Sequence, residues 1–86
     1  MITALNKLFD HGGRQFQLQA EDCGVEQAAF EVRVYERGAV LWKKRVGYAE
    51  LLQRGLPRIE QDEAILSLMD KTLVTVEAAI AKGKLG

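Results

Sequence analysis

Two different hydrophobic periods divide this chain, and that division limits the possible fold more than any other feature. Between residues 14 and 48, apolar side chains recur mostly at every second position, which is the period of a half-buried β-strand. From about residue 59 to residue 82 they recur at steps of three and four, which is the period of an amphipathic helix. The sequence therefore predicts an α+β domain, in which an antiparallel meander of three to four strands packs against a long C-terminal helix.

The predicted strands alternate between an apolar face and a polar face. They run from Arg14 to Asp22, from Ala28 to Glu36 and from Ala39 to Tyr48. Between the last strand and the long helix, the segment from Ala49 to Arg54 is expected to form a short helix that ends at Gly55. The predicted core consists of the apolar faces of these elements: Phe16, Leu18, Phe30, Val32, Val34, Trp42, Ile65, Met69, Leu73 and Val76.

Glycines in the turns set the expected register of the strands. Residues 36–38 predict a three-residue hairpin loop that closes at Gly38. Residues 22–24 have the same form, although a longer loop through Gln27 would keep the same faces. Asp at the start and Gly at the end of a turn require no catalytic explanation. The pairs that these loops predict are Val34 with Val40, Val32 with Trp42, Glu31 with Lys43, Phe16 with Phe30, and Leu18 with Ala28.

The N-terminal segment fits two structures. Gly12 and Gly13 can form a two-residue hairpin turn, which would place Phe9 beside Phe16 and Leu5 beside Ala20. A helix is the alternative, since apolar residues of this segment also fit one helical face: Ile2, Leu5, Leu8 and Phe9. We favour a first strand.

The long helix predicts self-association. A helix of about 22 residues is roughly 33 Å long, whereas a strand of eight residues spans about 27 Å. We therefore expect the C-terminal turns of the helix to extend beyond the sheet and to be covered by a second copy in a homodimer, with a sheet edge contributing. The candidate dimer contacts are Val76, Ala79, Ile80 and Leu85.

Composition and motifs argue against an enzyme. The 86 residues suffice for a single domain, 1–86, and 12 basic residues balance 12 acidic ones, so no whole-molecule field attracts nucleic acid. His11 is the only histidine and Cys23 the only cysteine, so one chain cannot assemble a zinc site. No phosphate loop, nucleophile elbow or dinucleotide fingerprint is present. We expect no catalytic residue, cofactor or metal.

A lone cysteine, no apolar run near the roughly 20 residues of a membrane span and no signal-peptide pattern predict a cytoplasmic domain without a membrane partner. The function that we favour is a non-enzymatic protein–protein interaction or self-association module with an unidentified protein partner. The alternative is single-stranded nucleic-acid binding by the outer sheet face, which would carry amides, cations and one aromatic ring. The residues of that candidate binding face are Gln15, Gln17, Gln19, Arg33, Tyr35, Lys43 and Arg45. A solvated face with Lys43 paired to Glu31 is the favoured interpretation, because the net charge is zero.

Two stretches, FDHGGRQFQLQAEDCG at residues 9–24 and VYERGAVLWKKRVGY at residues 34–48, resemble a set of small uncharacterised bacterial domains. The shared pattern is His-x-Gly-x-x-aromatic-x-x-Gln-x-Glu-Asp, followed by a hairpin and a C-terminal helix. The matching residues are His11, Gly13, Phe16, Gln19, Glu21 and Asp22. The resemblance implies no known activity, but it suggests that His11, Gln19, Glu21 and Asp22 share a purpose. Four meander strands followed by a helix also occur in some single-stranded nucleic-acid-binding folds, which is an analogy of fold alone.

Overall fold

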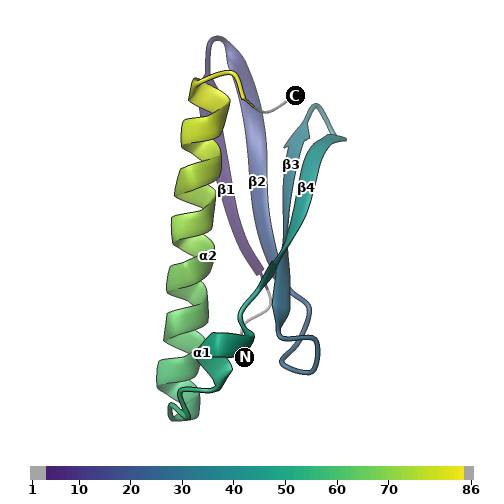
Figure 1. Cartoon of the computed structure of the whole chain (residues 1–86). Coiled ribbons are helices and arrows are strands. Elements are labelled where there is room, and N and C mark those ends of the chain that lie inside the picture. The colour runs from purple at the N-terminus through teal and green to yellow at the C-terminus, as the bar shows by residue number, and fades with distance from the viewer. Residues whose placement is uncertain (1–3, 85–86) are drawn as a thin grey trace.

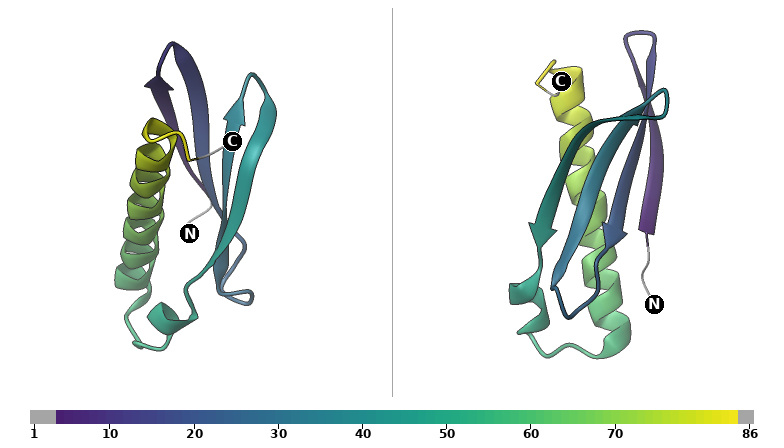
Figure 2. Two further views of the ribbon diagram at one scale, coloured as in Figure 1. Left: turned by 45° about the horizontal axis from the view of Figure 1, so that its top comes forward. Right: turned by 90° about the vertical axis from the view of Figure 1, so that its right-hand side faces the viewer.

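The structure, a computed structural model, describes residues 4–84, which form a four-stranded antiparallel sheet with a long helix on one face (Figure 1). The strands are β1 (Ala4–His11), β2 (Arg14–Asp22), β3 (Ala29–Glu36) and β4 (Ala39–Gly47), and the helices are α1 (Ala49–Leu52) and α2 (Arg58–Ala81). The strands lie in chain order, and α2 lies closest to β1 and β2 (Figure 2). The predicted α+β class, with a short helix between the meander and the long helix, is confirmed. We call the sheet face under α2 the inner face and the opposite one the outer face.

The first hairpin has the register that its glycines predict. Gly12 and Gly13 have φ values of +60° and +78°, as the two central residues of a type I′ turn require. Phe9 lies opposite Phe16, and Leu5 lies opposite Ala20. The N-terminal segment is therefore a strand, and the helical alternative is wrong for the described residues 4–11.

The connection between β2 and β3 is longer than the predicted three-residue loop. It spans residues 23–28, and β2 pairs with β3 so that Leu18 lies opposite Val34 and Ala20 opposite Val32. The predicted pairing of Phe16 with Phe30, and of Leu18 with Ala28, is therefore wrong. The faces are nevertheless as predicted, because the longer loop adds an even number of residues between the paired positions and so preserves their parity.

The β3–β4 hairpin also differs from its predicted register. Its turn has two residues, Arg37 and Gly38, with φ values of +53° and +80°, instead of three. Leu41 has no partner, and this β-bulge restores the inward direction of the strand after the shorter turn. The observed pairs are Tyr35 with Val40, Val34 with Trp42, Arg33 with Lys43, Val32 with Lys44, and Glu31 with Arg45. The predicted pairs of Val34 with Val40, Val32 with Trp42, and Glu31 with Lys43 are wrong.

The core lies between α2 and the inner face. The helix contributes a stripe at three- and four-residue steps, which is Ile65, Met69, Leu73, Val76 and Ile80. Nine of the ten predicted core residues are buried, and the exception is Trp42, which is half-buried. Trp42 lies on the edge strand β4, whose hairpin curves away from α2 (Figure 2). Tyr48 and Leu51 are core residues that the sequence reasoning missed.

The expected overhang of α2 occurs at the opposite end from the predicted one. Val76 and Ile80 are buried within the single chain, and Ala79 is half-buried. The β1–β2 hairpin reaches the C-terminal end of α2, where Phe16 and Ile80 line the same hollow, whereas the first turns of α2 extend past the sheet beside α1 (Figure 1). The reason for assigning Val76 and Ile80 to a dimer contact is therefore wrong, and Leu85 lies outside the described residues.

Candidate interaction surfaces

The outer face is organised in rows that cross the sheet. Because residues directly opposite one another project to the same face, the registers align one side chain from each strand. The first row is Leu8, Gln17, Tyr35 and Val40, the second is Asn6, Gln19, Arg33 and Lys43, and the third is Ala4, Glu21, Glu31 and Arg45. All seven residues of the predicted binding face project outward: Gln15, Gln17, Gln19, Arg33, Tyr35, Lys43 and Arg45.

Two of the three cations that the strands place on this face, Arg33 and Arg45, already bond to neighbouring side chains. Arg33 forms ion pairs with Glu21 at 3.1 Å and with Glu31 at 2.5 Å. The hydrogen bond to Glu21 is the main cause that raises the pKa of Arg33. Arg45 donates a hydrogen bond to the amide oxygen of Gln27. Within residues 4–84, Lys43 forms no ion pair, so the predicted partner Glu31 belongs to Arg33 instead.

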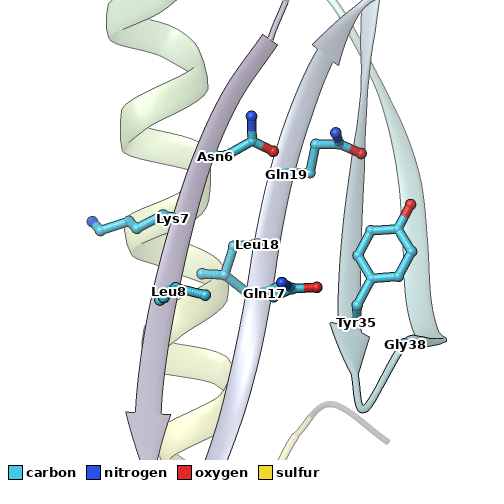
Figure 3. Close-up of a pocket in the computed structure, with 8 residues that line it drawn as sticks. All are labelled: Asn6, Lys7, Leu8, Gln17, Leu18, Gln19, Tyr35 and Gly38. Carbon is cyan, nitrogen blue, oxygen red and sulfur yellow. The ribbon is translucent and has the colours of Figure 1, made fainter.

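A hollow of about 440 Å³ lies on the outer face beside the first two rows (Figure 3). Its lining is Asn6, Lys7, Leu8, Gln17, Leu18, Gln19, Tyr35 and Gly38. Tyr35 stands at one side of the hollow, and the amides of Asn6, Gln17 and Gln19 project around it (Figure 3). No acidic side chain belongs to this lining.

The residues of the bacterial pattern do not form one site. His11 lies at the β1–β2 turn, where its ring stacks parallel to Phe9 with 6.2 Å between centroids. Asp22 lies at the other end of the hairpin, about 27 Å away for eight residues of strand. Gln19 and Glu21 do act together, because both accept hydrogen bonds from Arg33. Among residues 4–84, no three His, Cys, Asp or Glu side chains are grouped as a metal site would require.

Asp22 has a structural partner that the sequence reasoning missed. One oxygen of its carboxylate, Oδ1, accepts hydrogen bonds from the Gly24 amide at 3.1 Å and from the Tyr48 hydroxyl at 2.5 Å. Burial, followed by the hydrogen bond to Asp22, raises the pKa of Tyr48 far above its ordinary value. Strands β2 and β4 run in the same direction, so the residues that end them lie at the same edge of the sheet. That parallel relation is the signal that could have predicted this contact.

Asp22 and Cys23 therefore have structural roles at the β2–β3 connection. Asp22 holds the β2–β3 connection to the residue that follows β4, and the amide of Cys23 donates a hydrogen bond to the carbonyl of Ala29 at 3.0 Å. The Cys23 thiol is half-buried and lies 4.0 Å from the carbonyl oxygen of Glu21. Neither residue is placed beside a histidine, since His11 is at the far end of the hairpin.

The two free edges of the sheet differ in charge and in their surroundings. β4 presents Lys43, Lys44 and Arg45 in succession and contains the bulge at Leu41. Consecutive cations and a bulge are features by which edge strands avoid pairing with another strand. The β1 edge has one cation in its centre, Lys7, which forms an ion pair with Glu77 of α2 at 3.3 Å. The β1 edge is thus the one whose charge is compensated.

A flank of α2 that carries two exposed apolar side chains, with Asp70 between them, lies beside the β1 edge, and we call it the apolar flank. Glu77 identifies the side of the helix that faces this edge, because it contacts Lys7. Leu66 and Val74 precede Glu77 by eleven and three residues, which at 100° per residue places Leu66 about 20° from Glu77 toward the core and Val74 about 60° from it toward solvent. Val74 is 48% exposed and Leu66 is 38% exposed. Under this flank, Leu5 and Phe9 of β1 are only half-buried, so the core remains open at this side.

The chain matches no protein-family model, no curated protein and no solved structure. Among the described residues, no helix has the length and hydropathy that crossing a membrane requires. Inference about function therefore rests on the two surfaces above, the β1 edge with its apolar flank and the outer face with its hollow.

Proposed function

We propose that this protein is a non-enzymatic self-association module that forms a homodimer through the β1 edge and the adjacent flank of α2. The observation that carries the proposal is the unpaired edge of β1, where Lys7 contacts Glu77 of α2, together with the exposed side chains of Leu66 and Val74 on that side of the helix. Backbone pairing along an edge provides hydrogen bonds, and an apolar flank next to it provides buried area. This role requires no catalytic group.

A second copy of the chain suits this surface because the surface is self-complementary. Two β1 strands that pair antiparallel about a two-fold axis make one continuous sheet of eight strands, since each copy supplies four. The axis must be perpendicular to the sheet, so both α2 helices lie on the same side and their apolar flanks face each other. Leu5 and Phe9, which are half-buried in one chain, would then be covered from the side.

Charge supports β1 over β4 as the interface. Two β4 strands in the same arrangement would bring two runs of three cations together, which repel at close range. Two β1 strands bring together one cation from each copy, Lys7, and each Lys7 is already compensated by Glu77. The cost of bringing the two strands together is therefore lower at β1.

Sedimentation equilibrium at 10 to 200 µM tests the proposal, with substitutions chosen as matched pairs. We expect the wild-type chain to sediment as a dimer of 19.2 kDa, which is twice 9.6 kDa. Val74→Asp and Leu66→Asp each place a charge on the flank and should give the monomer. The controls are Val25→Asp, at a loop residue that is also 48% exposed, and Leu41→Asp, at a β4 residue that is also 38% exposed. Both controls should remain dimeric.

Two results would contradict the proposal. One is a wild-type chain of 9.6 kDa at every concentration. The other is a dimer that Leu41→Asp dissociates and Val74→Asp does not, because that result would place the interface at β4. Circular dichroism of each variant establishes that folding is intact, which is expected because the substituted side chains are all exposed.

A further inference from the structure

We propose that the outer face binds single-stranded nucleic acid, with a base stacked on Tyr35 in the hollow between β1 and β3. Tyr35 is half-buried, so one part of its ring is held by the sheet and the rest is available. It lies in the first row between Gln17 and Val40, and the exposed side chain of Leu8 ends the same row. An aromatic ring flanked by apolar and amide side chains is the kind of platform on which unpaired bases stack.

The amides around the ring match the edges of bases. Asn6, Gln17 and Gln19 each offer both a donor and an acceptor, which is what the Watson–Crick edge of an unpaired base requires. Within residues 4–84, the amides of Asn6 and Gln17 have no side-chain hydrogen bond, and Gln19 uses only its oxygen, toward Arg33. These groups are therefore available to a ligand.

The charges near the hollow suit a phosphate backbone. Lys43 ends the second row, and Arg37 lies in the turn next to Gly38, which lines the hollow. Neither cation forms an ion pair among the described residues. The acids of the outer face are Asp10, which projects beside Gln15, and Glu21 and Glu31, which are both held by Arg33. Lys43 and Arg37 are therefore the two cations beside the hollow that are available to phosphate groups, and Arg37 also lies in the electrostatic field of Glu36.

The surface favours a single strand over other ligands of related chemistry. The first row crosses four β-strands, a width of about 14 Å at 4.8 Å per strand, which exceeds the size of one base. A duplex keeps its bases stacked and paired, so it cannot use the ring or the amides. Two free cations also predict a weak dependence on salt, with a slope of about −1.4 for log K against log salt, at roughly −0.7 per phosphate contact.

This proposal does not depend on self-association. Pairing at the β1 edge would leave both outer faces open on the same side of a continuous sheet, but a monomer carries the complete hollow. The variants that test the two proposals lie on different surfaces, so failure of one leaves the other intact.

Fluorescence anisotropy with labelled 12-nucleotide strands at 50 and 200 mM salt tests the proposal. We expect a micromolar Kd at 50 mM that weakens about 7-fold at 200 mM, from the slope of about −1.4, and binding of a duplex of the same sequence at least about 10-fold weaker. Tyr35→Ala should weaken binding by about 5- to 150-fold, because stacking of one base contributes that much, whereas Tyr35→Phe should retain it.

Lys43 and Lys44 provide a matched pair of substitutions that tests whether the strand binds the outer face. They are neighbours in sequence with the same charge, but Lys43 projects outward beside Arg33, and Lys44 projects to the inner face opposite Val32. Lys43→Ala should weaken strand binding by about 3-fold or more, and Lys44→Ala should change it less than 2-fold. In ¹⁵N NMR spectra, the strand should shift the amides of Gln17, Gln19 and Tyr35.

The proposal would be overturned by the absence of strand binding at 100 µM protein and 50 mM salt, or by equal binding of strand and duplex. Equal effects of Lys43→Ala and Lys44→Ala, or full binding by a folded Tyr35→Ala variant, would overturn it as well. A mononucleotide that binds as tightly as the 12-nucleotide strand would also overturn it, since the site would then be one for free nucleotides. Thermal unfolding of each variant shows whether its fold is retained.

Discussion

The contact between Tyr48 and Asp22 should stabilise the fold, and Tyr48→Phe isolates it. The Tyr48 side chain is 2% exposed, its hydroxyl donates to Asp22 Oδ1, and its ring lies 6.3 Å from that of Phe30. Replacement by Phe retains the ring and removes only the hydroxyl. The substitution therefore measures the hydrogen bond without creating a large cavity.

The expected loss is about 1.5 kcal/mol at pH 7. A hydrogen bond to a charged group contributes roughly 1.5 to 3 kcal/mol, and the lower value applies because Asp22 is only half-buried and keeps its bond to the Gly24 amide. For a domain of this size, a loss of that magnitude lowers Tm by roughly 6 to 12 °C. Tyr48→Ala, which also removes the buried ring, should cost about 3 to 5 kcal/mol and leave little folded protein.

Urea unfolding followed by Trp42 fluorescence measures these values, and a double-mutant cycle with Asp22→Ala assigns them to the pair. We expect a coupling energy of about 1 to 1.5 kcal/mol. A coupling energy below about 0.3 kcal/mol would refute the reasoning, because the hydroxyl would then stabilise the fold without Asp22.

The stability that Tyr48 contributes should also depend on pH in the alkaline range. The pKa of Tyr48 is raised above its ordinary value of 10.0 by burial and by the bond to Asp22, so the folded state favours the neutral phenol. The stability from this group is fully present below pH 10 and is lost as the pH rises toward the folded pKa. The difference in unfolding free energy between wild type and Tyr48→Phe should therefore narrow above about pH 10. A constant difference from pH 8 to 11 would contradict this account.

Two further substitutions test the turn and the acid side of the stability profile. Gly12→Asn should stabilise the chain by about 0.5 kcal/mol, because Asn-Gly suits the type I′ turn at Gly12 and Gly13 and reduces the entropy of the unfolded state; a lower urea midpoint would contradict this. Glu36 has a pKa lowered from 4.5, mainly by its hydrogen bond from Arg14, so its contribution is present above pH 4.5 and is lost as the pH falls through the folded pKa. Glu36→Gln should reduce the fall of the urea midpoint below pH 4.5. If the urea midpoint falls as steeply in the variant as in the wild type, the Arg14–Glu36 pair does not contribute as expected.

The sequence by itself determined the features that depend on local periodicity and backbone conformation. Alternation placed Phe16, Leu18 and Val32 on one face, and the helical stripe from Ile65 to Ile80 was evident from its spacing. The Gly12-Gly13 turn followed from the positive φ values that a two-residue hairpin demands. These features need no distant contact, because a strand repeats every two residues and a helix every 3.6.

Tertiary structure decided the features for which local patterns offer several equivalent solutions. Two registers of β2 against β3 that differ by an even number of residues place every side chain on the same face of the sheet. The alternation of apolar and polar residues therefore could not fix the register of these strands. A three-residue turn and a two-residue turn followed by the bulge at Leu41 both direct Trp42 inward, and they differ in where Val40 points.

Burial at the helix end required the whole fold. Ile80 is buried because the distant β1–β2 hairpin extends as far as the last turns of α2, and the length of one element alone does not reveal where its partner begins. The contact of Tyr48 with Asp22 joins residues that are 26 positions apart and appears only when β2 and β4 share a sheet edge. Periodicity fixes which face a side chain lies on, but only the packing of distant segments fixes what that face meets.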